Sequence, residues 1–200
     1  MKEQAADRRG YRMVARAEAA AATRERILDA TDELFLARFN DRFSLEEVGQ
    51  GAGTTVQTVL RHFGSKEGVT DAAARRAAQR IRSQRALAPV GDVRGAVRNL
   101  IEHYEEHGDL AMRMLVEEHR TPFLREVTDR GRAVHREWVT RTFAPQLDRL
   151  RGAARERRLA QLVAVCDVYV WKLLRRDMSL GQRQTETALA ELIEGLEALG

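Results

Sequence analysis

Residues 48–63 of the chain read VGQGAGTTVQTVLRHF, two short amphipathic segments separated by a tight turn at residues 52–54. Gly53 permits a turn conformation that a side chain would oppose. Two short helices joined by such a turn cross steeply, which is the helix-turn-helix geometry. Apolar residues fall on one side of each segment, so we expect four of them to face inward: Val48, Ala52, Val59 and Phe63.

The outward side of the second segment carries hydroxyl, amide and cationic groups, and no Asp or Glu occurs between Thr54 and Lys66. Such groups suit phosphate oxygens and base edges, whereas phosphates repel carboxylates. Lys66 is expected in the first turn of the following helix, where free backbone amides also attract anions. A pair of short helices around a glycine turn also occurs in helical proteins that do not bind DNA, and this alternative stays open. The outward side chains that we predict to face DNA are Thr55, Val56, Gln57, Thr58, Arg61 and His62.

Helix-start signals divide the rest of the chain. Thr23 is a good N-cap for a helix over 23–38, and Ser44 with Glu47 forms a capping box ahead of the first short segment. A Pro/Gly break at residues 88–92 is the clearest boundary. Further helices are predicted over 66–85, 93–107, 109–119, 122–150, 155–177 and 180–199, and three of them begin after Asp92, after Thr121 and at a capping box over residues 179–182.

Composition limits the class of protein. The 200 residues are 44% apolar and 32% charged, which is enough to bury a core and excludes a disordered chain. No apolar run reaches the ~18–20 residues of a membrane span, and residues 1–22 lack the apolar stretch of a secretory signal. The single cysteine, Cys166, fits a reducing, cytoplasmic setting. The net charge of +4 is spread evenly along the chain, so it says little about partners.

These signals predict an all-α protein of three parts: a flexible basic arm (1–22), a helix-turn-helix head (23–70) and a helical body (71–200). Residues 1–26 hold seven basic and four acidic side chains. The arm would either lie along DNA, as basic arms of other DNA-binding domains do, or remain a solvated tail.

Residues 23–70 resemble the DNA-binding head of the tetracycline-repressor (TetR) family of transcription regulators. The resemblance rests on a Leu34-Phe35 pair in the first helix, the helix-turn-helix itself, and the closing segment HFGSKE at residues 62–67. It implies an all-α homodimer with a three-helix head, in which residues 71–200 form the ligand-binding and dimerisation domain. Two heads would enter successive major grooves of a double-stranded, pseudo-palindromic DNA operator, and a small-molecule inducer would bind the body.

By position, the resemblance implies base contacts from Thr55, Val56 and Gln57, and phosphate contacts from Thr58, His62, Lys66 and Ser44. The sequence departs from the family pattern at three positions. Leu60 stands where a tyrosine that contacts the DNA backbone is usual, Phe39 replaces a helix-ending glycine, and Thr54 replaces a valine of the turn.

The predicted helix over 155–177 is apolar on two opposite sides, so both sides need a cover. Its own domain supplies one cover, and a second subunit in a two-fold symmetric bundle supplies the other. A monomer that buries this helix at its centre is the alternative. The residues predicted at the dimer interface are Ala164, Val168, Trp171, Leu189, Leu192, Ile193 and Leu196.

A ligand cavity is expected among the preceding helices, lined by large and adaptable side chains. Each of these residues also fits a plain core position. Asp167 is the only acid between Gln161 and Lys172, and it suits either a cationic or hydroxylated inducer or an arginine across the dimer. The predicted lining residues are Leu100, Tyr104, Met112, Met114, Trp138, Phe143, Cys166, Asp167 and Tyr169.

Little in the sequence supports catalysis. His103 and His107 have a spacing that metal sites use, but their surroundings differ from the HExxH signature, and a solvated helix face is the expectation. Cys166 lies in an apolar stripe, where a thiol is inert. We therefore predict no enzyme, metal or cofactor, but a ligand-responsive transcriptional repressor. The alternative is a helical small-molecule-binding or interaction protein that has lost operator binding.

Overall fold

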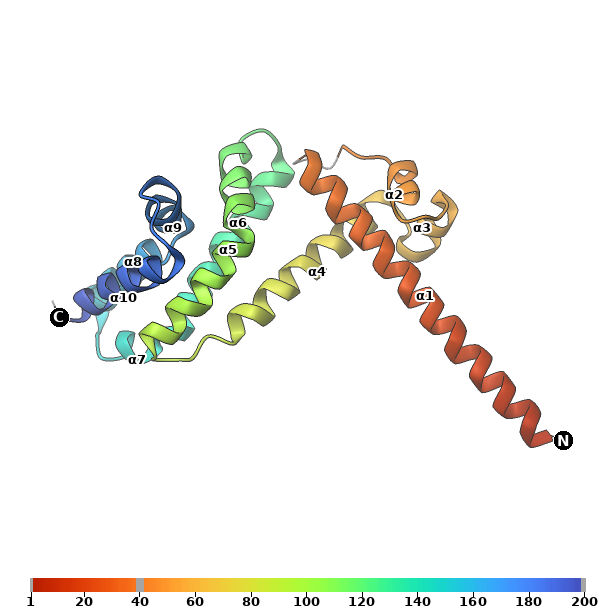
Figure 1. Ribbon diagram of the computed structural model, residues 1–200, viewed down its shortest axis with the longest axis horizontal. Helices are drawn as coiled ribbons and strands as arrows, with labels where there is room; N and C mark the ends of the chain where they lie inside the picture. Colours follow the sequence, from red (N-terminus) through yellow and green to blue (C-terminus); the bar gives the residue numbers. More distant parts are fainter. Residues whose placement is uncertain (1, 39–41, 199–200) are drawn as a thin grey trace. The chain divides into compact units, whose positions relative to one another are not determined.

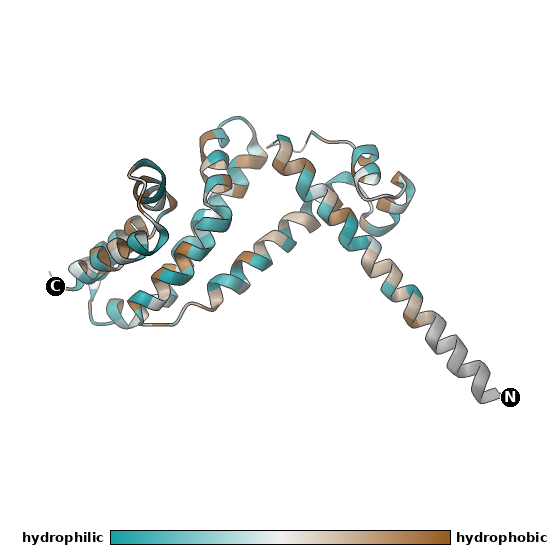
Figure 2. Ribbon diagram, in the orientation of Figure 1, coloured by the Kyte–Doolittle hydropathy of each residue, from teal (hydrophilic) through white to brown (hydrophobic). Residues whose placement is uncertain are grey.

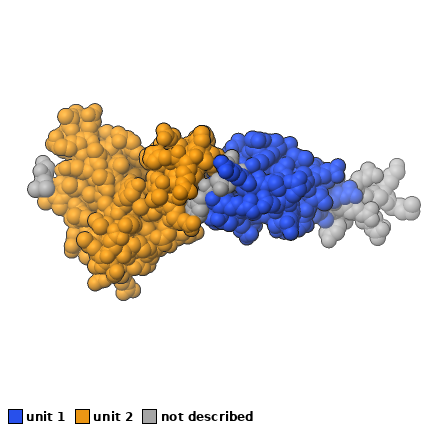
Figure 3. All heavy atoms as spheres, turned by 90° about the horizontal axis from the view of Figure 1, so that it is seen from above, with its two compact units in different colours: residues 1–77 blue, residues 78–200 orange. Residues whose placement is uncertain are grey.

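The structure is a computed structural model that describes residues 2–38 and 42–198, with the side chains of residues 13–38 and 42–198. All regular secondary structure in these ranges is helical, as predicted (Figure 1). The chain divides into two compact units, residues 1–77 and 78–200 (Figure 3). In the described ranges, none of the helices combines the length and apolar character that crossing a bilayer requires.

The first unit is built from α1 (Lys2–Arg38), α2 (Leu45–Gly51), α3 (Val56–Phe63) and the first part of α4 (Lys66–Ala86). Figure 1 shows α2 and α3 lying beside α1. Val48, Ala52 and Val59 are buried in the common core with Ile27 of α1, as predicted. Phe63 is only half-buried and packs on the edge of the same core.

Helix α1 is much longer than the sequence analysis predicted. It begins at Lys2 rather than at Thr23, so the predicted boundary at residue 22 falls inside a continuous helix. The run of alanines at 19–22 has the strongest helix propensity of any residue type and outweighs the capping preference of Thr23. The Thr23 hydroxyl accordingly donates back to the carbonyl of Ala19 at 2.9 Å instead of capping a new helix.

One arginine fastens α4 to α1. The Arg76 side chain is 13% exposed, and its guanidinium lies 2.9 Å from Glu25, 2.9 Å from Asp29 and 2.6 Å from Asp32. Burial lowers the pKa of Arg76, but the hydrogen bonds with Asp32 and Glu25 more than offset it, so the net direction is upward. The helix that leaves the head is therefore held to α1 by a charge that stays ionised.

The second unit contains the rest of α4, followed by α5 (Val93–Glu117), α6 (Pro122–Thr142), α7 (Ala144–Leu147), α8 (Gly152–Val165), α9 (Val168–Lys172), a π-helical turn η1 (Leu173–Asp177) and α10 (Gln182–Ala198). Teal and brown residues alternate along α5 in Figure 2, as expected for a helix with one buried side. Helix α5 packs against α9 and α10 around a core that includes Leu100, Ile101 and Ile193.

Several helix ends in this unit differ from the prediction. The helix expected over 122–150 ends at Thr142, because Phe143 leaves the helical conformation before the short α7. The helix expected over 155–177 breaks at Cys166, and Asp167 caps α9 by accepting a hydrogen bond from the backbone of Tyr169. The capping box predicted at residues 179–182 does not form. Instead α10 begins at Gln182, and the backbone of Gly181 donates to the Gln184 side chain.

The helices predicted over 93–107 and 109–119 are one helix, α5, with Gly108 in its interior. A Cβ atom at Gly108 would lie 2.5 Å from the ring of Trp171, so glycine here makes room for an aromatic ring rather than ending the helix. Trp171 is 1% exposed, and its indole nitrogen donates to Glu105 at 2.9 Å. The ring therefore has little freedom to move aside.

Gly108→Ala should lower the free energy of unfolding by about 1–3 kcal/mol, because the methyl group overpacks the site against Trp171. Gly131→Ala is the matched control. Gly131 also lies inside a helix, but a Cβ there meets nothing within 4 Å, so the substitution should stabilise by about 0.5–1 kcal/mol. Denaturant unfolding of the wild type and both variants measures these changes in the free energy of unfolding. Equal effects of the two substitutions would contradict the packing argument.

Candidate nucleic-acid interface

Helix α2 starts at the capping box that the sequence predicted. The Ser44 hydroxyl accepts a hydrogen bond from the backbone of Glu47 at 3.2 Å, and the Glu47 carboxylate accepts one from the backbone of Ser44 at 2.8 Å. The hydrogen bond with Arg38, followed by that with Ser44, lowers the pKa of Glu47. This acid is thus neutralised by Arg38 at the start of the motif, and the half-buried Ser44 is held in place by the cap.

The turn between α2 and α3 is fixed by backbone hydrogen bonds. The amides of Gly53 and Thr54 donate to the carbonyls of Gln50 at 3.1 Å and Gly49 at 2.8 Å. Gly53 has a φ of 61°, the left-handed conformation for which the sequence predicted glycine. From α1, the Arg26 guanidinium donates to the carbonyl of Ala52 at 3.3 Å. The turn is therefore tied to the core helix as well as closed on itself.

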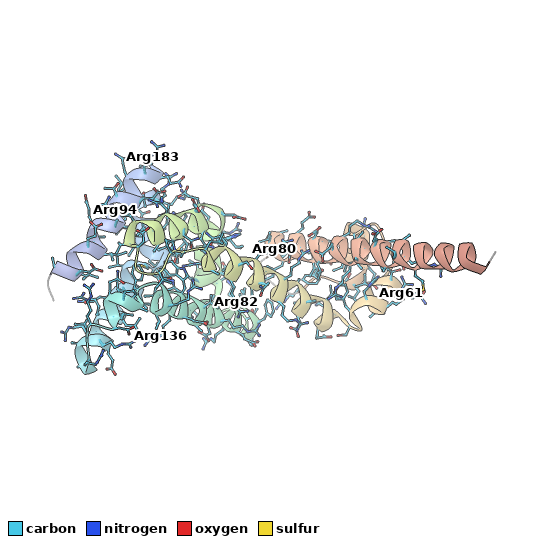
Figure 4. The ribbon with its side chains drawn as sticks, turned by 90° about the horizontal axis from the view of Figure 1, so that it is seen from below. Arg61, Arg80, Arg82, Arg94, Arg136 and Arg183 are labelled. Carbon is cyan, nitrogen blue, oxygen red and sulfur yellow. The ribbon has the colours of Figure 1, made fainter. Side chains whose placement is uncertain are left out.

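Helix α3 presents the predicted polar side chains, and two of them also shape the helix. Thr55 is the N-cap, whose hydroxyl accepts from the backbone of Thr58 at 3.2 Å, and the two threonine hydroxyls lie 3.2 Å apart. Gln57 and Arg61 are exposed, and Arg61 is labelled in Figure 4. Val56 is half-buried. The exposed polar side chains available for direct contact are thus Gln57 and Arg61, with the capping threonines beside them.

The closing segment brings two further predicted residues to the end of α3. His62 is half-buried, with its ring next to Phe63 at a centroid distance of 6.2 Å. Lys66 is the first residue of α4, and its ammonium lies 5.3 Å from the centroid of the Phe43 ring. Such a cation–π contact positions the charge without neutralising it. Lys66 therefore stays available for a phosphate at the start of α4.

Arg24 of α1 contacts the end of α3, and it is not among the residues predicted for the interface. Its guanidinium lies 4.3 Å from the centroid of the Phe63 ring and donates to the carbonyl of His62 at 3.4 Å. It therefore adds a cation at the end of α3. The signal was the helical spacing: Arg24 precedes the buried Ile27 and Leu28 by three and four residues, so all three share one side of α1.

Five of the predicted ligand residues share one buried core in the second unit: Leu100, Tyr104, Trp138, Phe143 and Cys166. Burial raises the pKa of the Cys166 thiol to about 12, so this cysteine stays protonated at neutral pH. Two surface hollows lie elsewhere, at the start of α10 over residues 181–191. Met112 and Met114 are half-buried, Asp167 caps α9, and Tyr169 is 54% exposed. Tyr169 thus points away from the core in which it was expected.

Four of the residues predicted at a dimer interface lie instead in the core of their own chain. These are Val168, Trp171, Leu189 and Ile193. For Val168 and Trp171, the prediction assumed one straight helix over 155–177, and the break at Cys166 rotates the sides of the helix that follows it. Leu189 and Ile193 lie on α10, whose buried side packs against α5 of the same chain. Of the other three, Ala164 and Leu192 are exposed and Leu196 is half-buried.

His103 and His107 lie side by side on α5, with ring centroids 5.0 Å apart. Burial, followed by the nearby Arg85, lowers the pKa of His103 to about 2, so its ring is neutral. Within residues 13–38 and 42–198, no group of three or more His, Cys, Asp or Glu side chains is arranged to hold a metal ion.

Residues 27–73 match the family model of bacterial regulatory proteins, tetR family. The whole fold is similar to a transcriptional regulator from Rhodococcus sp. Rha1, at 19% identity over 86% of this chain and 95% of that one, with a TM-score of 0.59. It is also similar to a regulator of the TerR/AcrR family from Aquifex aeolicus VF5 (18% identity, 89% and 99% coverage, TM-score 0.55) and to a TetR-family regulator from Streptomyces coelicolor A3 (17%, 89% and 96%, 0.51). The comparison with curated proteins found no match.

Proposed function

Because this chain belongs to the TetR family of transcriptional regulators, we propose that it is a ligand-responsive repressor. In this proposal a homodimer binds a pseudo-palindromic operator in the cytoplasm, and a small-molecule inducer releases it. The protein acts by binding alone, without catalysis or a cofactor. The observation that carries the proposal is the outer side of α3, where Gln57 and Arg61 are exposed and no carboxylate occurs between Thr54 and Lys66.

Such a surface fits the two parts of DNA recognition. Cations at Arg24, Arg61 and Lys66 suit phosphates, which fix the position of the head, while the Gln57 amide can donate to and accept from a base edge. In a dimer, two heads placed ~34–36 Å apart meet successive turns of one face of the duplex.

Release by an inducer needs a link between the two units, and α4 supplies it. This helix runs without interruption from Lys66, beside the DNA-facing side of the head, to Ala86 in the second unit. A ligand that prefers a body conformation incompatible with the operator would act through this helix. Reversing a 1:99 population fully takes a ~10⁴-fold preference of the ligand for that state.

The proposal is tested by titrating the protein onto the DNA that flanks its own gene, with fluorescence anisotropy as the readout. We expect salt-dependent binding that is tighter than to unrelated DNA of the same length. The competing function, a helical ligand-binding protein without operator binding, is favoured by Leu60, which is 39% exposed where the family usually has a DNA-contacting tyrosine. Binding that does not differ between the two DNAs would favour this alternative.

Lys66→Ala should weaken binding to all DNA sequences alike and reduce the slope of log affinity against log salt by about 0.9, because one phosphate contact is lost. The matched control is Lys172→Ala, which removes a cation that pairs with Asp177 in the second unit. Anisotropy titrations over a range of salt concentrations measure both slopes. An unchanged slope in Lys66→Ala would show that Lys66 does not contact a phosphate.

Gln57→Ala should reduce discrimination between base pairs at one operator position by about 1–3 kcal/mol, while the salt slope stays as in the wild type. Gln50→Ala is the control, since Gln50 is also exposed but lies on α2. Competition between operator variants measures the preference. A uniform loss of affinity without a change in preference would assign Gln57 to the phosphate backbone instead.

The proposed dimer is tested at Leu192, which is 49% exposed on α10 and belongs to the predicted interface. Leu192→Glu should raise the dimer dissociation constant at least about tenfold, because a carboxylate would be buried between apolar side chains. Val116→Glu changes a 73% exposed residue on α5 and should leave the constant unchanged. Sedimentation velocity measures both, and dimers of equal stability in the two variants would place the interface elsewhere.

A further inference from the structure

An arginine near the end of α4 is buried without a charged partner. Arg85 is 5% exposed, and the hydrogen-bond donors on Nε and Nη1 have no acceptor. No carboxylate in the described part of the chain forms an ion pair with it. A guanidinium is a cation in proteins, so a positive charge is buried at this position.

Two aromatic rings hold the guanidinium in place. Its central carbon lies 4.8 Å from the centroid of the Trp138 ring and 5.3 Å from that of Tyr104. The Trp138 indole also donates to the Arg85 carbonyl at 3.0 Å, and Arg141 donates to the same carbonyl at 2.9 Å. Aromatic faces ease the burial of a cation, but they accept no hydrogen bonds in the plane of the guanidinium.

Two buried histidines stand next to these rings. His103 lies beside Tyr104, with ring centroids 5.4 Å apart, and His135 stacks on Trp138 at 6.4 Å. Nδ1 of each histidine lacks a partner. Burial, and in both cases Arg85 as well, lowers the pKa of these imidazoles, although the Val163 carbonyl raises that of His135. We refer to Arg85, His103, Tyr104, His135 and Trp138 as the Arg85 cluster.

We propose that the Arg85 cluster is a binding site for a small organic monocarboxylate, whose carboxylate accepts hydrogen bonds from the Arg85 guanidinium. Arg85 contributes one positive charge, and the carboxylate of Asp167 is near enough to act on Tyr104 and His135 without forming an ion pair with Arg85. The cluster therefore balances at most a singly charged anion and not a phosphate dianion. The surrounding core, which includes Leu100, Ile101 and Leu162, is apolar and suits an apolar ligand body.

This site rests on the proposed function, because it gives the inducer a chemical class and places its anchor on α4. The Arg85 cluster is buried, so a carboxylate reaches Arg85 only when side chains of the core move. The partly buried Met112, Leu115 and Val163 border the same core. Binding is thereby coupled to a rearrangement around the end of α4, which is what an inducer of this protein has to produce.

The test is calorimetric titration of the full-length protein with benzoate and with octanoate, each against a neutral counterpart, benzamide and octanol. Inorganic phosphate and chloride distinguish a general anion site from an organic acid site. We expect saturable binding of at least one carboxylate, and a melting temperature of the protein that rises with the concentration of that carboxylate. The neutral counterparts and the inorganic anions should not bind. No carboxylate binding, or equal binding of phosphate, would overturn the proposal.

Arg85→Met should weaken carboxylate binding at least about 30-fold. It should also raise the melting temperature of the ligand-free protein, because a buried unpaired charge is removed. The matched control is Arg82→Met, which changes an exposed arginine on the same helix (Figure 4). It should change neither the carboxylate affinity nor the melting temperature of the ligand-free protein. Arg85→Lys keeps a cation but lacks the planar guanidinium, and it replaces Arg85→Met in the binding measurement if the methionine variant does not fold. Wild-type carboxylate affinity in either Arg85 variant would overturn the assignment.

Operator binding is measured on the same samples, which separates the two proposals. A wild type that binds DNA but no carboxylate would refute the site and leave the repressor intact. A wild type that binds a carboxylate but no DNA would refute the repressor and leave the site. We expect the carboxylate to weaken DNA binding of the wild type and to have no effect on DNA binding by Arg85→Met.

Discussion

The burial of Val59 in the core of the first unit is the constraint on which the exposed polar side of α3 depends. Val59 and Val48 are fully buried in one core, and each contributes about 1.5–3 kcal/mol through the removal of apolar surface from water. With Val59 inside, a helix as short as α3 has only one orientation about its axis, and Gln57 and Arg61 necessarily point outward. Burial of the apolar side of α3 thus determines which of its polar side chains are exposed.

Helix α4 carries a cation in contact with aromatic rings at each of its two ends. Its first residue, Lys66, is a cation held against an aromatic ring in the head, and Arg85, in its last turn, is a cation held between aromatic rings in the body. Between them, Arg76 fixes the helix to three carboxylates of α1. A change around Arg85 therefore acts on a helix whose other end is firmly attached to the helix-turn-helix.

Local signals in the sequence predicted the head well and the body less well. The capping box at Ser44 and the turn at Gly53 depend on neighbouring residues only, so they can be read directly. Val168 and Trp171 lie in the core of their own chain because the break at Cys166 changes the helical phase, and no Pro or Gly marks that break. The sequence predicts two helices on either side of residue 108, because the role of Gly108 depends on Trp171, which is distant in sequence.

Arg85 shows why a buried charge such as that of the proposed carboxylate site does not emerge from the sequence alone. In the sequence it is one of several arginines in a helix with no apolar pattern, the usual appearance of a solvated residue. Only tertiary packing reveals that it is buried and that its Nε and Nη1 donors have no acceptor. A chain that gained nothing from this charge would be more stable with an apolar residue there, because desolvation of an unpaired cation opposes folding. A ligand that binds the folded state and supplies the missing acceptor offsets this cost, so the instability itself favours a role in binding.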